Sequence, residues 1–509
     1  MEERLRAVCD LMVPTVRETA GLHEYDGRVQ DLSPDGVRAG LDALRRARRT
    51  GDATVVPGSH DDAHLTAFEE SLRAQLGTLQ LHRRDPYLHL ANLEVACYDR
   101  EYAPAEERAI ARRRHLAAWP DAVDGAIASL DRLAAPVAGA LLGTVRGLAT
   151  GLHPDQGTET ADALAAHARL VGHLARAAEY GDPDFALGAE GLALLMSSQE
   201  CLPVDLGRLA ERADAERDRL RALLAESCRA LDPGRTPARL VPRLLADHPD
   251  AAGVVPEAAR LTEELIAFTR ERGLAPHTDG VCLVGPAPES RRWSTAMMTW
   301  SGPGEPDAPS WYHLAPPDPG RPAGEREEWL TVFSRTTLPA ITAHEVAPGH
   351  FAHGRSLRRA ATPVRRALHS LAFCEGWAHY AEEVCLEEGF RGGDARFAVG
   401  VALEALVRVT RLACAIGLHT GAMDVAEATR RFMADAHLPR TGAAAEARRG
   451  TFDACYGRYT WGKLEIRALR ERTRAAWGPA FTLPRFHRAL LDLGSPPLGL
   501  LPAEGLRPS

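Results

Sequence analysis

Apolar residues in the first half of the chain are spaced as in amphipathic helices. The clearest stretch is 204–231, where apolar residues recur three, four or seven positions apart with charged residues between them. The same spacing covers 159–179 and 261–272. We therefore expect residues 1–275 to form an N-terminal helical region.

The pattern changes at Gly273. Nine of the 35 prolines lie between positions 286 and 322, so this stretch cannot be one continuous helix. Short runs of strand-forming residues at 281–284, 294–300 and 311–314 predict a small β-sheet, and helical spacing returns near position 338. The prediction is a mainly α protein, with a small sheet beside the helices of a second region, 276–509. We expect the two regions to form one interlocked unit.

Composition and charge indicate which classes of binding partner and which cellular location to expect. Lys and Arg number 61 against 69 Asp and Glu, a net charge of −8, and both signs are interleaved, which argues against a nucleic-acid-binding face. The longest apolar run, 133–145, is too short for the roughly 20 residues of a membrane span. The N-terminus has no apolar signal segment, and the nine cysteines form no CxxC pair. We therefore expect a cytoplasmic protein with a small-molecule partner, and no membrane or nucleic-acid partner.

Candidate chemistry is concentrated in residues 337–350. Thr337 is expected to cap a helix that carries His344 and Glu345 about two turns later. An adjacent His-Glu pair on a helix is how zinc hydrolases place a metal ligand beside a general base. The usual second histidine, four residues after the first, is absent because position 348 is proline.

The next histidine, His350, would lie on the wrong face of a regular helix, about 240° from His344. Pro348 should open the helix, because its ring crowds the carbonyl of residue 344 and it has no N–H to donate. Gly349 would then supply the backbone freedom to turn His350 back towards the metal. His353, three residues further on, is the alternative ligand.

A tetrahedral catalytic zinc ion needs a third protein ligand and one open position. Glu375 is the candidate, and His379 and Glu382 follow it on the same stripe of an otherwise apolar helix. That helix begins either after Thr362 or after Ser370. A buried stripe of histidine and carboxylates needs a partner, and a metal ion with supporting hydrogen bonds would be one.

These segments resemble the bacterial domain-of-unknown-function family 885, whose members are similar to zinc metallopeptidases. The family patterns His-Glu-Ala-x-Pro-Gly-His-His, Glu-Gly-Trp-Ala-x-Tyr-x-Glu and Pro-Gly-Gln-Ala-x-x-Tyr-x-x-Gly correspond here to 344–351, 375–382 and 453–462. The resemblance implies a large helical metallopeptidase-like fold, distantly similar to the carboxypeptidase Taq family. It also implies the following roles: zinc ligands His344, His350 and Glu375, general base Glu345, and transition-state donor Tyr459.

The chain departs from the family pattern around the pocket. Phe351 replaces a histidine, Ala415 stands where many members have Asp, and Asp453-Ala454-Cys455 replaces Pro-Gly-Gln. We expect three further residues to bind substrate: His379, Arg448 and His419.

The sequence thus predicts an enzyme with one zinc ion that hydrolyses an amide bond in a short peptide or amino-acid conjugate. The altered pocket positions support an alternative, a biosynthetic metalloenzyme that catalyses acyl transfer, condensation or rearrangement. A non-catalytic binding protein is less consistent with the sequence, because all three ligands and the base are present.

Overall fold

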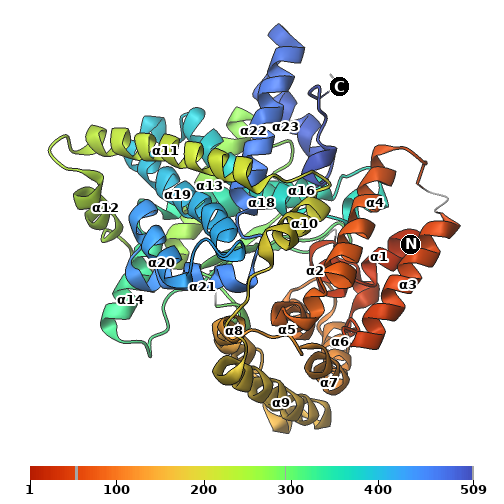
Figure 1. Ribbon diagram of the computed structural model, residues 1–509. Helices are drawn as coiled ribbons and strands as arrows, with labels where there is room; N and C mark the ends of the chain where they lie inside the picture. Colours follow the sequence, from red (N-terminus) through yellow and green to blue (C-terminus); the bar gives the residue numbers. More distant parts are fainter. Residues whose placement is uncertain (52–54, 293, 306, 507–509) are drawn as a thin grey trace.

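The computed structural model describes residues 1–51, 55–292, 294–305 and 307–506, and helices dominate it (Figure 1). The N-terminal helices are α1 (Glu3–Cys9), α2 (Val13–Thr19), α3 (Pro34–Thr50), α4 (His60–Leu72), α5 (Pro86–Leu93), α6 (Ala105–Ala117), α7 (Trp119–Ser129), α8 (Ala135–Gly147) and α9 (Thr158–Tyr180). The next group is α10 (Gly188–Glu200), α11 (Leu206–Leu231), α12 (Pro237–Leu245) and α13 (Val254–Arg272). The predicted helices at 159–179, 204–231 and 261–272 are confirmed as α9, α11 and part of α13.

The second region contains the remaining helices and the sheet. Its helices are α14 (Ala323–Leu330), α15 (Leu338–Glu345), α16 (His350–Leu357), α17 (Pro363–Ala367), α18 (Leu371–Glu387), α19 (Ala395–His419), α20 (Val425–Asp435), α21 (Arg440–Phe452), α22 (Arg458–Trp477) and α23 (Leu483–Leu491). The mainly α prediction is therefore confirmed.

The predicted small sheet is also confirmed. It consists of β1 (Cys282–Pro286), β2 (Ala296–Thr299) and β3 (Ser310–Leu314), in the order β1-β3-β2. β1 pairs with β3 in parallel and β2 pairs with it antiparallel, so that Tyr312 lies opposite both Val284 and Met298. Tyr312 is fully buried and belongs to the apolar cluster that joins the sheet to α13, α15 and α16.

Hydrophobic packing crosses the boundary expected at residue 275. α11 lies along α19 (Figure 1), and buried residues of α10 and α11 share one cluster with those of α18–α23. The N-terminal helices have their own clusters, one of which includes Val364 and Leu368 from the second region. The two regions are therefore joined through their cores.

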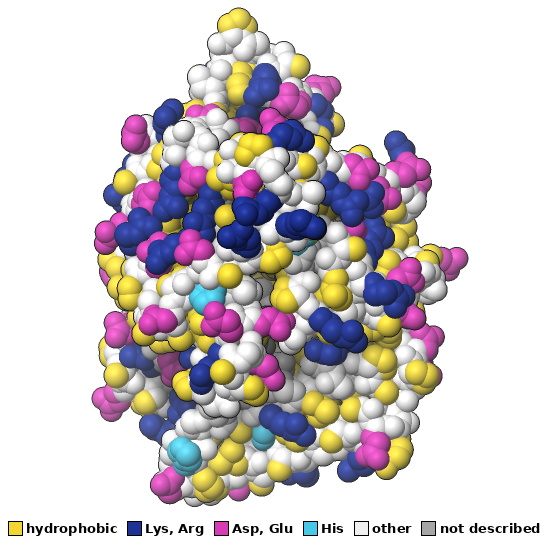
Figure 2. All heavy atoms as spheres, turned by 90° about the vertical axis from the view of Figure 1, so that its left-hand side faces the viewer, with side chains coloured by type: hydrophobic (Ala, Val, Ile, Leu, Met, Phe, Trp, Pro, Cys, Tyr) yellow, Lys and Arg dark blue, Asp and Glu magenta, His cyan; other side chains and the backbone are white. Residues whose placement is uncertain are grey.

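The molecular surface carries both signs of charge. On the face in Figure 2, Lys and Arg side chains gather across the middle with Asp and Glu side chains between them. Among the described residues, no helix combines the length and the apolar character that crossing a membrane requires.

Candidate metal centre

A break between α15 and α16 positions the two histidines. α15 ends at Glu345, the Ala347–Pro348 peptide bond is cis, and α16 begins at His350. The helix therefore does not continue through the proline, as its chemistry predicts. Thr337 does precede the helix, but the capping prediction was wrong, because its hydroxyl donates to the carbonyl of Val332 instead.

Gly349 is needed at this break because the backbone is crowded there, and not because of a positive φ. Its φ is −68°. A Cβ atom at this position would lie 1.9 Å from the carbonyl oxygen of His344. The backbone of the turn therefore passes directly over the end of α15, and only a residue without a side chain allows this approach.

The third candidate ligand, Glu375, comes from α18, which is anchored to the same turn. The Ser370 hydroxyl accepts a hydrogen bond from the Phe373 N–H and begins α18, while Thr362 caps the separate short helix α17. The indole N–H of Trp377 donates to the carbonyl of Pro348 at 2.9 Å. This bond holds the first turns of α18 against the α15–α16 break, and so brings Glu375 to the histidines.

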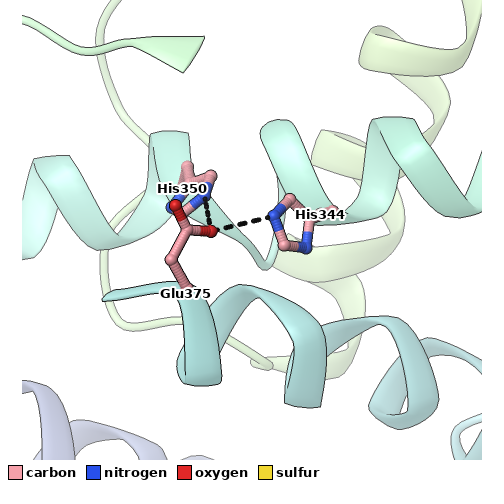
Figure 3. Close-up of side chains that lie close together, drawn as sticks. All are labelled: His344, His350 and Glu375. Carbon is pink, nitrogen blue, oxygen red and sulfur yellow. Dashed lines mark ion pairs between the residues drawn. The ribbon is translucent and has the colours of Figure 1, made fainter. Parts of the chain in front are cut away.

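Three side chains converge on one point (Figure 3). Oε2 of Glu375 lies 3.4 Å from Nε2 of His344 and 3.3 Å from Nε2 of His350. A tetrahedron with metal–ligand bonds of about 2.0–2.1 Å has ligand–ligand edges of about 3.3–3.4 Å. The two distances to Glu375 match such edges, the three ligand atoms lie within 4.8 Å of one another, and nitrogen and oxygen donors suit a zinc ion. Within the described parts of the chain, these three residues are the group that could hold a metal ion.

The surroundings of His344 favour a positive charge. Its Nδ1 lies 2.7 Å from Oε1 of Glu382, which Arg408 holds from the other side at 3.3 Å. Burial and Arg408 lower the pKa of His344, but Glu375 and Glu382 outweigh them and raise it to about 9. When Nδ1–H donates to Glu382, Nε2 is left as the ligand atom, which is the usual arrangement for metal-binding histidines.

Two further histidines near the cluster, His353 and His379, do not point towards Glu375. Nε2 of His353 pairs with the Ser495 hydroxyl at 2.9 Å, so the alternative in which His353 replaces His350 is not supported. His379 is buried, with Nδ1 3.5 Å from Oε2 of Glu382, and it does not line the cavity described below. The prediction that His379 contacts the substrate is therefore wrong. Its side chain lies against Glu382 and not on the cavity wall.

A cavity of about 780 Å³ opens over the ligand cluster, between the N-terminal helices and the helices of the second region. Glu345 and Tyr459 line it together with the three ligands. Burial raises the pKa of Glu345, while the neighbouring His344 and His350 oppose this shift. A buried carboxylate with a raised pKa is suited to accept a proton near neutral pH.

Tyr459 reaches the cluster because α18 and α22 approach very closely. A Cβ on Gly376 would lie 2.5 Å from the Cα of Gly462, so both glycines are required at this crossing. The Tyr459 ring then lies 6.1 Å from the His344 ring, centroid to centroid. Burial and the negative charge of Glu375 raise the pKa of Tyr459, which keeps its phenol protonated and able to donate.

The remaining predicted residues lie on the cavity wall or outside it. His419 lines the cavity, and its Nε2 pairs with the carbonyl of Gly450 at 2.9 Å. Arg448 is exposed and does not line the cavity, whereas the next residue, Arg449, does. One step along a helix turns a side chain by about 100°, which separates the two arginines. The spacing of Arg449 and Asp453, one helical turn apart, is the sequence signal that could have identified the correct arginine.

The family follows from comparison with known proteins. A model of a bacterial protein family of unknown function, DUF885, matches residues 14–504. The chain belongs to this family. The segments 344–351, 375–382 and 453–462, which contain the candidate site residues and the closely packed glycines, all lie within the range that the DUF885 model matches.

Solved structures share the fold of this DUF885 protein. A candidate lipoprotein of unknown function from Shewanella oneidensis has 18% identity and a TM-score of 0.76, covering 98% of this chain and 97% of that chain. A candidate lipoprotein from Colwellia psychrerythraea has 16% identity and a TM-score of 0.77, with the same coverage of both chains. No curated protein matches the chain by sequence.

Proposed function

We propose that this DUF885 protein is a zinc-dependent hydrolase that cleaves an amide bond in a short peptide or an amino-acid conjugate. The observation that carries the proposal is the spacing of His344, His350 and Glu375, which matches the edges of a tetrahedral zinc site at a cavity wall. The adjacent His344-Glu345 pair, which resembles the His-Glu pair of zinc hydrolases, supports the same reaction class.

Each residue of the site has its own role in the proposed reaction. A bound zinc ion would lower the pKa of a water molecule to about 7 and polarise the substrate carbonyl. Glu345, next to the ligand His344 and facing the cavity, accepts the proton of the attacking water and returns it to the departing amine. Tyr459 donates its O–H to the oxygen on which negative charge develops. Glu382 and Arg408 keep the His344 ring in one orientation throughout.

The proposal includes a cytoplasmic location. The nine cysteines support it, because none of them is in a disulfide within the described residues. The two solved structures are named as candidate lipoproteins, which gives this part a direct test. Fractionation of cells that make the native protein should recover it in the soluble fraction. Recovery with the membranes would contradict the location without affecting the proposed reaction.

The reaction is tested by the substitution Glu345→Gln, which keeps the size of the side chain and removes its basicity. Zinc-loaded protein would be assayed on a panel of dipeptides and N-acyl amino acids. Glu345→Gln should keep zinc and fold but lose about 10²–10⁴-fold in kcat. The matched control is Glu387→Gln at the exposed end of α18, which should retain wild-type activity.

Two outcomes would contradict the proposal. Activity of Glu345→Gln within a few-fold of wild type would remove Glu345 as the base. A zinc-loaded wild-type protein that hydrolyses no member of the panel would overturn the hydrolase, and would favour acyl transfer, condensation or rearrangement on the same metal centre.

A further inference from the structure

One wall of the metal cavity carries two guanidinium groups that share a single carboxylate. Nη2 of Arg449 lies 3.0 Å from Oδ2 of Asp453, and Arg458 pairs with Oδ1 of the same side chain. Both oxygens of Asp453 are therefore occupied, and the three side chains together carry one excess positive charge. Arg449 comes from the last turn of α21, and Arg458 is the first residue of α22.

This charge lies beside the proposed reaction centre. Arg449, Asp453, Arg458 and Tyr459 line the same cavity, and Arg449 donates a hydrogen bond to the Tyr459 phenol. The side chains of Arg449 and Arg458 are 24% and 17% exposed, so each is largely removed from bulk solvent but still reaches the cavity. Partly buried charges of this kind are screened much less by salt than surface charges.

No other carboxylate among the described residues neutralises the pair at ion-pair distance. Glu446 is already bound by both Nε and Nη2 of Arg411, at 2.7 Å each. Glu200, also on the cavity wall, accepts hydrogen bonds from the Ser370 hydroxyl and from the N–H of Leu498. The excess positive charge therefore remains available to a ligand.

We propose that Arg449 and Arg458 bind an anionic group of the substrate, a carboxylate, close to the amide bond that is cleaved. Guanidinium groups match the paired oxygens of a carboxylate or a phosphate in geometry as well as in charge. The nearby apolar wall, which includes Phe452, Met297 and Met298, suits an apolar side chain on the same molecule. The substrate class is then an acylated amino acid or short peptide with a free carboxylate. This inference rests on the proposed function for the identity of the scissile bond.

Binding of small probes without a hydrolysable bond tests the anion site separately from the reaction. The probes are 3-phenylpropionate, the neutral 3-phenylpropanol and 2-phenylethylphosphonate, titrated calorimetrically into the zinc-loaded full-length protein. The carboxylate should bind about tenfold more tightly than the alcohol, because charge-assisted hydrogen bonds are roughly twice as strong as neutral ones. It should also bind at least as tightly as the phosphonate.

The variants are Arg449→Gln, Arg458→Gln and the control Arg448→Gln, which makes the same charge change one residue away on the exposed face of α21. The first two should each reduce the preference for carboxylate over alcohol to less than twofold, and the control should leave it unchanged. Carboxylate binding to the metal alone would survive all three substitutions. Arg449→Lys, which keeps the charge, should retain part of the preference if Arg449→Gln does not fold.

Three results would decide against the assignment or refine it. The anion site would be overturned if wild type, Arg449→Gln and Arg458→Gln all preferred the carboxylate over the alcohol to the same degree. It would also be overturned if wild type bound the alcohol more tightly than the carboxylate. A phosphonate that binds more tightly than the carboxylate through Arg449 would overturn the carboxylate and assign a phosphate group instead. Loss of hydrolysis on every panel substrate with the binding preference intact would overturn the proposed function and leave the anion site standing.

Discussion

Two buried charge clusters lie on either side of α18, and consecutive residues of that helix belong to different clusters. Glu382 pairs with His344 of the candidate metal cluster, which is formed by His344, His350 and Glu375. Glu383, the next residue, pairs with the fully buried Lys463. Both clusters combine carboxylates with basic side chains, yet their internal pairing differs.

The Lys463 cluster is complete without a ligand. Nζ of Lys463 lies 2.9 Å from Oε1 of Glu216 and also pairs with Glu383, while Arg219 binds both carboxylates. Arg467 lies 3.6 Å from Glu216. Every carboxylate therefore has a cation of the protein beside it, as buried charges require.

Among the described residues, the candidate metal cluster has an arginine or lysine at ion-pair distance from only one of the carboxylates around it. Glu345, Glu375 and Glu382 surround the histidines, and Arg408 reaches Glu382 but pairs with no other member of this set. Histidine side chains supply the remaining contacts, and His344, whose pKa is raised to about 9, carries a positive charge that it would give up when its Nε2 binds a metal ion. A candidate ligand site thus differs from a structural ion-pair network in that its positive charge is carried largely by imidazole, from which a metal ion can displace the proton, even where the residue types are similar.

The largest expected effect comes from removing a metal ligand. Glu375→Ala should reduce zinc from about one ion per chain to a trace, because two histidines alone do not hold zinc tightly. Glu383→Gln, on the other side of the same helix, should leave the zinc content unchanged. Elemental analysis after gel filtration measures both. Equal zinc in wild type and Glu375→Ala would show that the cluster is an ordinary ion-pair network.

Breaking the second cluster should affect stability and leave metal binding intact. Lys463→Met leaves Glu216 and Glu383 without their shared cation, and should lower the free energy of unfolding by about 3–5 kcal/mol. Adding Glu383→Gln should recover part of that loss, because one uncompensated charge is removed. Urea denaturation measures the stability, and zinc per folded chain should stay constant. A loss of less than about 1 kcal/mol would mean that Lys463 contributes little to this network.

The turn between the histidines should be sensitive to a single methyl group. Gly349→Ala puts a Cβ where the His344 carbonyl lies, so the turn must move and carry His350 with it. A displacement of about 1 Å at a functional group can cost about 10²-fold, and we expect a loss of this order in zinc affinity. Gly172→Ala in α9, where a Cβ has free space, is the control and should bind zinc normally. Unchanged affinity in Gly349→Ala would show that His350 does not depend on this turn.

The smallest expected effect concerns the carboxylate behind His344. Glu382→Gln keeps a hydrogen-bond acceptor for Nδ1 but removes its charge, and should weaken zinc binding by about 10–100-fold. Glu383→Gln is again the matched control. Competition with a chelator measures both affinities. The same affinity in the two variants would place Glu382 among the purely structural carboxylates.

Much of the secondary structure could be predicted because its signals are local. The apolar spacing of α9 and α11 and the strand-forming runs of the sheet identify these elements within a few residues of sequence. The break between His344 and His350 could be predicted for a similar reason, since Pro348 and Gly349 mark it in the sequence. Side-chain direction is harder to predict from sequence. The sequence favours Arg448 as a substrate contact, but Arg449 lines the cavity, and His379 lies against Glu382 and not on the cavity wall.

The sequence by itself determined which helices form, where α15 must end, and which residue types are available for metal and proton chemistry. Tertiary structure decided that Glu382 faces the metal cluster and Glu383 faces Lys463, and that Arg449 and Arg458 share a wall with Tyr459. The physical reason is the distance along the chain over which each effect acts. Helix propensity, capping and proline effects act within one or two turns, whereas the site depends on the close crossing of α18 and α22 at Gly376 and Gly462.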